Sequence, residues 1–153
     1  MNLKTRRLGA EDMIEAKSLF TLLSEVFDEP RRILSNAYLE ALLRDADFWA
    51  VAAFDGDEVI GGATAYVLAM TRSESREMFI YDVAVRPTYQ RRGVGSRVMA
   101  DLAGWAALSG IDETFVLADN GDVNALAFYR ALGGRPSAVT SFGFPRANRP
   151  RDR

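Results

Sequence analysis

The sequence predicts an α/β protein of the α+β kind, with one mixed, mostly antiparallel central sheet and helices on both of its faces. The first observation behind this prediction is the turn "DGDE" at 55–58, which separates two apolar runs and is typical of an antiparallel hairpin. The second is the alternation of strand-like and helix-like segments after residue 77, because strands joined through a helix need a crossover connection. One sheet must therefore contain both hairpin connections and helical crossover connections.

The periodicity of apolar residues predicts the elements in order. A weakly alternating strand at 2–8 precedes a helix at 10–27, whose apolar residues recur at helical spacing. The break "DEPRRIL" follows, and Ser35 or Asn36 can cap a second, shorter helix. The remaining predicted elements are hairpin strands at 48–54 and 59–70, a strand at 77–85, a helix at 95–108, a strand at 114–118, a helix at 123–132 and a closing strand at 137–144.

Length and composition predict one domain over residues 1–145. The chain has 153 residues and is 48% hydrophobic, which is enough for a sizeable core. No apolar run approaches the about 18 to 20 residues that a membrane span needs, and "MNLKTRRLGAED" contains no apolar signal core. We expect a cytoplasmic protein with no membrane partner, and a disordered basic tail at 146–153.

Two missing residue types and the charge balance limit the reactions and partners that the chain can have. Cysteine and histidine are both missing, which excludes disulfides, thiol nucleophiles, Cys/His metal sites and imidazole bases, so no metal is expected. Outside the tail the chain holds 15 basic and 20 acidic side chains. An acidic body disfavours nucleic acid as a partner and is compatible with a small cationic substrate.

The stretch "QRRGVG" at 90–95 joins a predicted strand to a predicted helix and favours an anion site. Unpaired N–H groups and the helix dipole give such a corner a partial positive charge. Gly93 and Gly95 allow close approach of a diphosphate, and Arg91 and Arg92 add charge around it. No Gly-Lys-Ser/Thr follows and the third glycine of a dinucleotide fingerprint is missing. The alternative is an ordinary glycine-bearing turn with solvated arginines.

Two blocks, "YDVAVRPTYQRRGVGSRVM" at 81–99 and "NALAFYRALGG" at 124–134, resemble the GCN5-related N-acetyltransferase (GNAT) superfamily. The resemblance implies a GNAT-type fold and acetyl-coenzyme A as co-substrate. It implies that loop amides hold the pyrophosphate and that the preceding strand offers main-chain hydrogen bonds to pantetheine, although those strand residues also suit a simple buried strand. The implied cofactor-binding residues are Val83, Ala84, Val85, Arg91, Arg92, Gly93, Val94, Gly95, Ser96, Asn124 and Phe128.

Tyr129 and Asp82 are the candidate catalytic residues. By resemblance, Tyr129 lies near the thioester sulfur and protonates the departing thiolate, since an ordinary pKa near ~10 keeps a phenol protonated. The alternative is an aromatic residue on a core face. Without histidine, the base that deprotonates an amine must be a carboxylate, and Asp82 interrupts an apolar strand where burying a charge is costly. An aspartate paired with a neighbour is the alternative, and Glu77 is the reserve.

The segment "FIYDVAV…QRRGVG" followed by "LADNGDVNALAFYRALG" is similar to the small aminoglycoside 3-N-acetyltransferases. That resemblance implies acetylation of the 3-amino group of a deoxystreptamine ring, antibiotic resistance and a homodimer. Asp119 and Asp122, with Glu77, would attract a polycationic sugar, although any loop and helix cap uses such residues. The segment "EVFDEPRRIL" at 25–34 is the expected substrate lid.

Two other functions stay open at this point. Another GNAT enzyme, acting on a polyamine, an amino acid or a protein amino terminus, would share every cofactor residue. A non-catalytic acyl-CoA-binding regulator would bind the same cofactor without turnover. For an enzyme, direct transfer through a ternary complex is expected, because the chain has no cysteine to carry an acyl group.

Overall fold

The computed structural model describes residues 1–30 and 32–145, so the predicted tail at 146–153 lies outside the described residues. The chain divides into two compact units, the first covering Met1–Leu117 and the second beginning at Ala118. The single domain expected over residues 1–145 stays a prediction.

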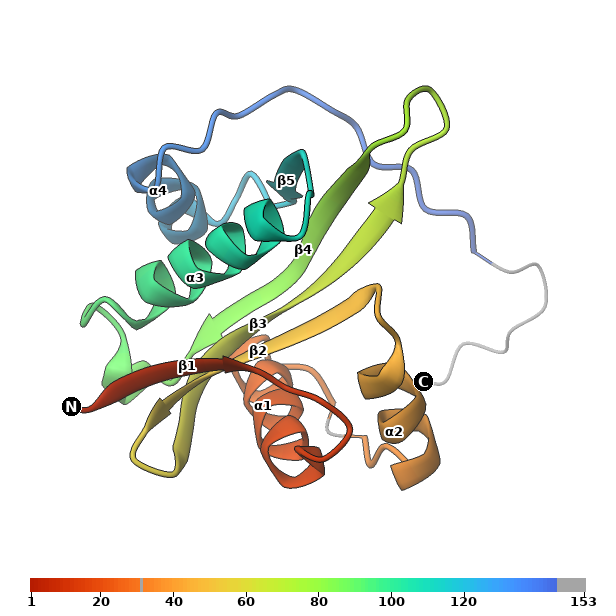
Figure 1. Cartoon of the computed structure of the whole chain (residues 1–153). Coiled ribbons are helices and arrows are strands. Elements are labelled where there is room, and N and C mark those ends of the chain that lie inside the picture. Colours follow the sequence, from red (N-terminus) through yellow and green to blue (C-terminus); the bar gives the residue numbers. More distant parts are fainter. Residues whose placement is uncertain (31, 146–153) are drawn as a thin grey trace. The chain divides into compact units, whose positions relative to one another are not determined.

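The first unit contains a five-stranded sheet in the order β1-β2-β3-β4-β5 (Figure 1). Its first four strands pair antiparallel, and β5 is parallel to β4. The predicted mixed, mostly antiparallel sheet is therefore confirmed, and with it the hairpin around "DGDE". The strands are β1 (Leu3–Arg7), β2 (Phe48–Asp55), β3 (Glu58–Ala69), β4 (Arg76–Val85) and β5 (Glu113–Val116).

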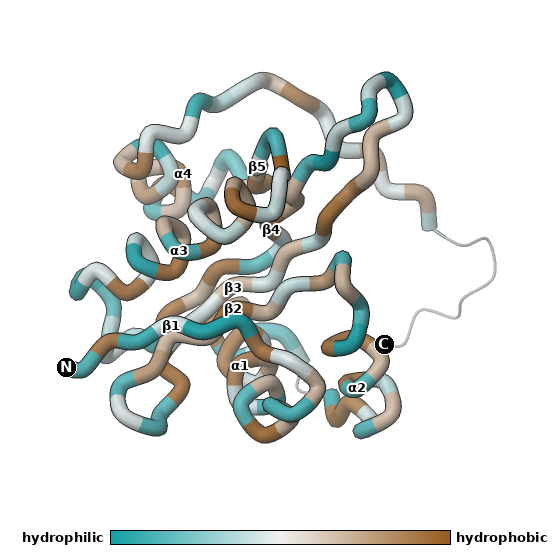
Figure 2. Tube along the Cα trace, in the orientation of Figure 1, coloured by the Kyte–Doolittle hydropathy of each residue, from teal (hydrophilic) through white to brown (hydrophobic). Residues whose placement is uncertain are grey.

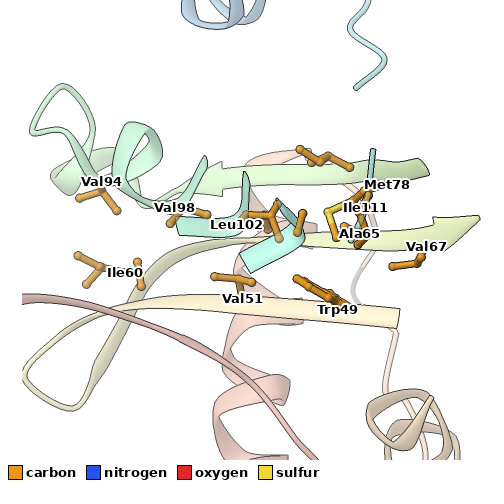
Figure 3. Close-up of a cluster of buried hydrophobic side chains, with 14 residues drawn as sticks. Trp49, Val51, Ile60, Ala65, Val67, Met78, Val94, Val98, Leu102 and Ile111 are labelled. Atoms are coloured by element: carbon orange, nitrogen blue, oxygen red, sulfur yellow. The ribbon is translucent and has the colours of Figure 1, made fainter. Parts of the chain in front are cut away.

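Helix α3 (Val94–Leu108) is the crossover that makes β5 parallel to β4. Its buried residues Val94, Val98, Leu102 and Ala106 recur every four positions, so they form one apolar stripe. Figure 3 shows this stripe facing side chains of the sheet such as Val51. The residues of the stripe and Val51 are almost fully buried. Each such aliphatic side chain contributes about 1.5–3 kcal/mol through burial.

Helices α1 (Met13–Val26) and α2 (Asn36–Arg44) belong to the opposite face of the sheet (Figure 1). The alternation along β2 explains the two faces, because Phe48 and Ala50 pack with α1 whereas Trp49 and Val51 pack with α3. Ser35 caps α2, since its Oγ accepts the N–H of Tyr38 at 3.1 Å. The prediction of helices on both faces is confirmed.

The hydropathy of the chain follows these two layers. Figure 2 shows apolar residues along the central strands and hydrophilic residues at the end of the β3–β4 hairpin. None of the helices formed by the described residues is long and apolar enough to cross a lipid bilayer.

Two β-bulges interrupt the ladders of β3. In the pairing of β2 with β3, the register shifts so that Ile60 has no partner, and in the pairing of β3 with β4 the same is true of Tyr81. Beside the first bulge the backbones approach closely, because a Cβ on Gly62 would overlap the Val51 carbonyl oxygen. The second bulge aims Tyr81 and Asp82 toward the α1 side of the sheet.

The second unit contains helix α4 (Val123–Ala131), which Asp122 caps by accepting the N–H of Ala125 at 2.9 Å. The closing strand predicted at 137–144 is wrong, because none of these residues forms a strand. The pattern explains the error: Val139 and Phe142 lie three positions apart, which breaks the period of two, and Gly143 weakens strand formation further.

Candidate functional site

The corner that the sequence predicts to bind anions lies between β4 and α3. A short 3-10 helix, η1 (Pro87–Tyr89), follows β4, and the chain then enters α3 through two left-handed residues, Arg91 (φ 61°) and Gly93 (φ 81°). Alternating backbone conformations of this kind turn successive N–H groups toward one point and create a concave nest for anions. A left-handed arginine is costly for the backbone, and such residues concentrate at functional sites.

The first turn of α3 leaves its N–H groups available. Gly93 is the N-cap residue and supplies no side-chain hydrogen bond to the helix. Among the described residues, the first amide of the helix to find a backbone acceptor is that of Arg97, 3.0 Å from the Gly93 carbonyl oxygen. The preceding amides and the positive end of the helix dipole therefore suit a bound phosphate group.

The two arginines of the corner are exposed and add positive charge to it. Neither Arg91 nor Arg92 forms an ion pair with any described residue. The guanidinium of Arg92 lies 5.7 Å from the ring centroid of Tyr89, whose hydroxyl donates to Glu58 Oε2 at 3.1 Å. The positive charge of the corner is therefore not neutralised by a carboxylate in this part of the chain.

The last part of β4 has a free edge within the first unit. Strand β5 pairs with β4 only from Glu77 to Ile80, so the stretch from Asp82 to Val85 continues beyond the end of β5. The side chains of Val83 and Val85 pack on the α3 core, while Ala84 is buried on the α1 side. Because these side chains are buried or partly buried, the main chain is the part of the segment best placed to meet an extended ligand. The Val85 carbonyl already accepts from Gln90 Nε2 at 3.0 Å.

Asp82 lies at the second bulge, with its side chain beside Thr64 on β3. Thr64 Oγ1 donates to Asp82 Oδ2 at 3.3 Å, and the threonine is only 6% exposed. Burial raises the pKa of Asp82, the Thr64 hydrogen bond opposes that rise, and the negative charge of Glu29 adds to it. A carboxylate whose pKa is raised toward neutrality is a better proton acceptor for an amine.

Three further groups surround Asp82 that no sequence motif indicates. These are Thr64 on β3, Glu29 after α1, and Tyr66, whose pKa is raised by burial and by the nearby Tyr38, Tyr81, Asp82 and Asp45. Thr64 is the one with a signal in the sequence, because it is a hydroxyl residue within the otherwise apolar run "VIGGATAYVLAM". Glu29 and Tyr66 are brought to Asp82 by tertiary structure.

Glu77 lies at the other end of β4 from Asp82. It is the cross-strand partner of Glu113 on β5, and both carboxylates line a hollow of about 450 Å³ together with Arg72 and Asp112. Glu77 and Asp82 lie five positions apart on the strand, which corresponds to about 15 Å at the usual rise per residue. The structure therefore places the two candidate bases far apart on one strand.

A larger hollow, of about 820 Å³, lies between α1 and α2. Its lining includes Phe20, Ser24 and Leu39 from the helices, and Glu29 and Leu34 from the segment expected to be a substrate lid. Arg31 of that segment lies outside the described residues.

The other predicted site residues belong to the second unit. The rings of Phe128 and Tyr129 contact each other on α4 at 5.2 Å, and Asn124 is exposed in its first turn. Asp119 accepts the N–H of Gly121 at 2.6 Å, while Asp122 is the helix cap. Both carboxylates thus take the loop and cap roles that the sequence left open, and the roles of all five residues in catalysis or binding stay predictions.

A cationic corner before α3, a strand edge that continues beyond β5 and a half-buried carboxylate lie along one continuous segment of the first unit. Comparison with known proteins gives the class directly, because residues 16–133 match the acetyltransferase (GNAT) family. The chain therefore belongs to the GNAT acetyltransferase family.

The relatives of the chain agree with this assignment. An uncharacterized N-acetyltransferase, YvbK, from Bacillus subtilis is 30% identical over 141 residues, covering 91% of this chain and 81% of the relative. An aminoglycoside acetyltransferase from an uncultured soil metagenomic sample, solved in complex with sisomicin, has a TM-score of 0.90 at 31% identity, covering 94% of this chain and 95% of its own. A second aminoglycoside acetyltransferase from such a sample, HMB0005, has a TM-score of 0.91 at 30% identity, covering 96% and 100%.

Proposed function

We propose that this acetyltransferase moves the acetyl group of acetyl-coenzyme A to a primary amine of an aminoglycoside, at the 3-N position, and thereby confers antibiotic resistance. The observation that carries the proposal is Asp82, a half-buried carboxylate with a raised pKa, on the strand that leads into the anion-binding corner. The similarity to two aminoglycoside acetyltransferases at 30% and 31% identity supports the acceptor class.

The residues of the first unit fit acetyl-coenzyme A. The diphosphate would meet the amides from Arg91 to Ser96, where the left-handed Arg91 and Gly93 form the nest. The pantetheine arm, an extended chain of amides, would run along the free edge of β4 from Val83 to Val85. When bound, the carrier supplies an activated thioester. Asn124 and Phe128 are proposed as further contacts.

Asp82 is the proposed general base. In the direct transfer, a new carbon–nitrogen bond forms as the carbon–sulfur bond of the thioester breaks, and the amine loses one proton. Asp82 Oδ1 or Oδ2 takes that proton directly or through a water molecule. Thr64 holds the carboxylate in place, and burial, with a further contribution from the charge of Glu29, keeps its proton affinity high.

Tyr129 is the proposed general acid, which gives the phenol proton to the departing thiolate. The predicted outcome of Tyr129→Phe is a fall in kcat of about a hundredfold, the usual scale of acid catalysis, with acetyl-coenzyme A affinity unchanged. Stopped-flow turnover and calorimetric titration of the carrier measure the two quantities. Turnover equal to that of the unmodified enzyme would remove Tyr129 from the mechanism.

The decisive experiment for the proposed function is an acceptor screen with acetyl-coenzyme A, in which release of free thiol is followed. We expect turnover with sisomicin and gentamicin, acetylation at the 3-amino group by mass spectrometry and NMR, and resistance in bacteria that express the protein. Turnover confined to polyamines or peptide amino termini would show that the protein is an acetyltransferase with an acceptor other than an aminoglycoside. Binding of the carrier without turnover of any amine would favour a non-catalytic regulator.

Asp119 and Asp122 are proposed to attract the ammonium groups of the acceptor through the carboxylate oxygens that their loop contacts leave free. The homodimer and the cytoplasmic location remain predictions.

A further inference from the structure

Six aromatic rings form a continuous row across the α1 side of the first unit. The row begins on α1, crosses β2, β3 and β4, and ends on β5. Successive ring centroids lie 6.3, 5.2, 5.9, 5.4 and 5.0 Å apart, and the last pair is stacked with an interplanar angle of 4°. In order, the members of this aromatic row are Phe20, Phe48, Tyr66, Tyr81, Phe79 and Phe115.

Three of the four rings away from α1 are exposed, and the fourth, Phe79, is partly buried. Phe48 is 4% exposed, whereas Tyr66, Tyr81 and Phe115 are 38%, 59% and 39% exposed. This contrast follows from the packing. The apolar core between α1 and the sheet includes Phe20 and Phe48 but none of the other four rings of the row. Contiguous exposed aromatic surface is unusual on a soluble domain and marks a binding site.

Acidic groups lie at both ends of this set of four rings. Asp82 adjoins Tyr81 at one end. Glu77 and Glu113 are at the other, on the face of Phe79 and Phe115, because residues two apart on a strand share a face. Like charges directly opposite each other destabilise a sheet, so this carboxylate pair favours a bound cation. Arg72 lines the same hollow but forms no ion pair with any described residue.

The face therefore combines flat aromatic surface with negative charge. A protonated amino-sugar ring complements both properties, since its apolar face packs on aromatic rings and its ammonium groups are attracted to ring faces and carboxylates. A neutral apolar partner would leave the carboxylate pair of Glu77 and Glu113 unrelieved, and an anionic one would be repelled by it.

We propose that Tyr66, Tyr81, Phe79 and Phe115 form a second acceptor subsite, which binds a cationic ring other than the one being acetylated. This inference rests on the proposed function, in which the reacting amine lies at Asp82. The subsite extends about 15 Å from Asp82 to Glu77, so an acceptor with several linked rings can reach both ends. The enzyme consequently prefers acceptors with two or more cationic rings over a single aminocyclitol.

The test compares sisomicin, which has several rings, with 2-deoxystreptamine, which has one. In Tyr81→Leu and Phe115→Leu we expect kcat/KM for sisomicin to fall about tenfold, through KM, which corresponds to about 1.4 kcal/mol and lies within the range of cation–π contacts. For 2-deoxystreptamine the change in Phe115→Leu should stay within about twofold, because its single ring at Asp82 does not reach Phe115 at the far end of the row. Leu108→Ala is the control, since Leu108 is an 88% exposed apolar residue on α3.

Equal losses for the two acceptors in Phe115→Leu, or no loss for sisomicin, would overturn the subsite. A changed oligomeric state of Tyr81→Leu in sedimentation experiments would also overturn it, because the row would then be covered by a second copy of the chain.

A binding measurement separates this inference from the proposed function. Ring resonances of the aromatic row are followed by NMR as sisomicin is added to the unmodified protein, with Tyr81→Leu used for assignment. If the protein acetylates neither acceptor but these resonances shift, the proposed acceptor chemistry falls and the subsite stands. If the resonances do not shift, the subsite is wrong whatever the turnover.

Discussion

The corner at residues 91–96 and the bulge at Tyr81–Asp82 lie on one continuous segment of chain, yet they are built in opposite ways. The corner is cationic and exposed, and its shape depends on the backbone conformations of Arg91 and Gly93. The bulge is anionic and half-buried, and Asp82 depends on Thr64, 18 residues away, and on the charge of Glu29.

The difference separates two tasks of a transferase. A carrier with a fixed diphosphate can be bound by a local motif, because backbone N–H groups and a helix dipole recognise it whatever lies around them. An amine must be deprotonated by a group whose pKa is tuned, and such tuning needs burial and neighbouring charges from several elements. Substitutions in the corner should therefore act on binding of the carrier, and substitutions at the bulge on the chemical step.

Asp82→Asn gives the largest expected effect. Because the amide cannot accept a proton from the ammonium group, kcat/KM for the amine should fall by about a hundredfold or more. Calorimetry should show acetyl-coenzyme A affinity unchanged within about twofold, since the corner is intact. Asp57→Asn, in the exposed β2–β3 turn, is the control. A loss of carrier affinity as large as the loss of turnover would show that the bulge also takes part in carrier binding, and would contradict the separation of the two roles.

Gly93→Ala should lower the affinity for acetyl-coenzyme A about tenfold, with little effect on kcat. A Cβ at Gly93 meets open space, but the left-handed backbone costs a residue with a Cβ about 1–2 kcal/mol, so the corner must deform or lose stability. Gly110→Ala, at φ +71 beyond the other end of α3 and also in open space, is the matched control. It should lower the free energy of unfolding similarly and leave carrier affinity unaltered.

Arg91→Gly should move stability and binding in opposite directions. Glycine adopts φ 61° without strain, so the free energy of unfolding in urea should stay constant or rise by up to about 1 kcal/mol. The affinity for acetyl-coenzyme A should fall several-fold and become less dependent on salt, because one positive charge is lost. A variant that binds the carrier as tightly as before would show that backbone amides alone form the site.

Thr64→Val and Glu29→Gln should shift the acidic limb of the pH–rate profile in opposite directions. Only the deprotonated Asp82 accepts a proton, so activity falls as the pH drops through its pKa. The Thr64 hydrogen bond lowers that pKa, so its loss moves the limb to higher pH; the charge of Glu29 raises it, so its loss moves the limb to lower pH.

At a pH on this limb we expect rates about two- to threefold slower for Thr64→Val and faster by a similar factor for Glu29→Gln. Thr64→Ser keeps the hydroxyl and should behave like the unmodified enzyme. Limbs that move together, or not at all, would show that another group titrates.

Much of the fold was predictable because its signals are local. The turn "DGDE" specified the β2–β3 hairpin, and the helix predicted at 95–108 corresponds to α3 (Val94–Leu108). The apolar content of the segment 137–144 predicts a strand, although its spacing does not fit the period of two that a strand needs. A strand also requires a neighbouring edge, and a pattern along one segment cannot specify that neighbour.

The sequence by itself determined the segments that form β1 to β5, the glycine-bearing turn before α3 and the family, because glycine positions, turn residues and apolar spacing act over a few residues. Only the tertiary structure decided the surroundings of Asp82 and the continuity of the aromatic row. A bulge at Tyr81 shifts the register of β4 by one residue, and side chains from α1, β2, β3 and β5 meet only once the sheet has assembled.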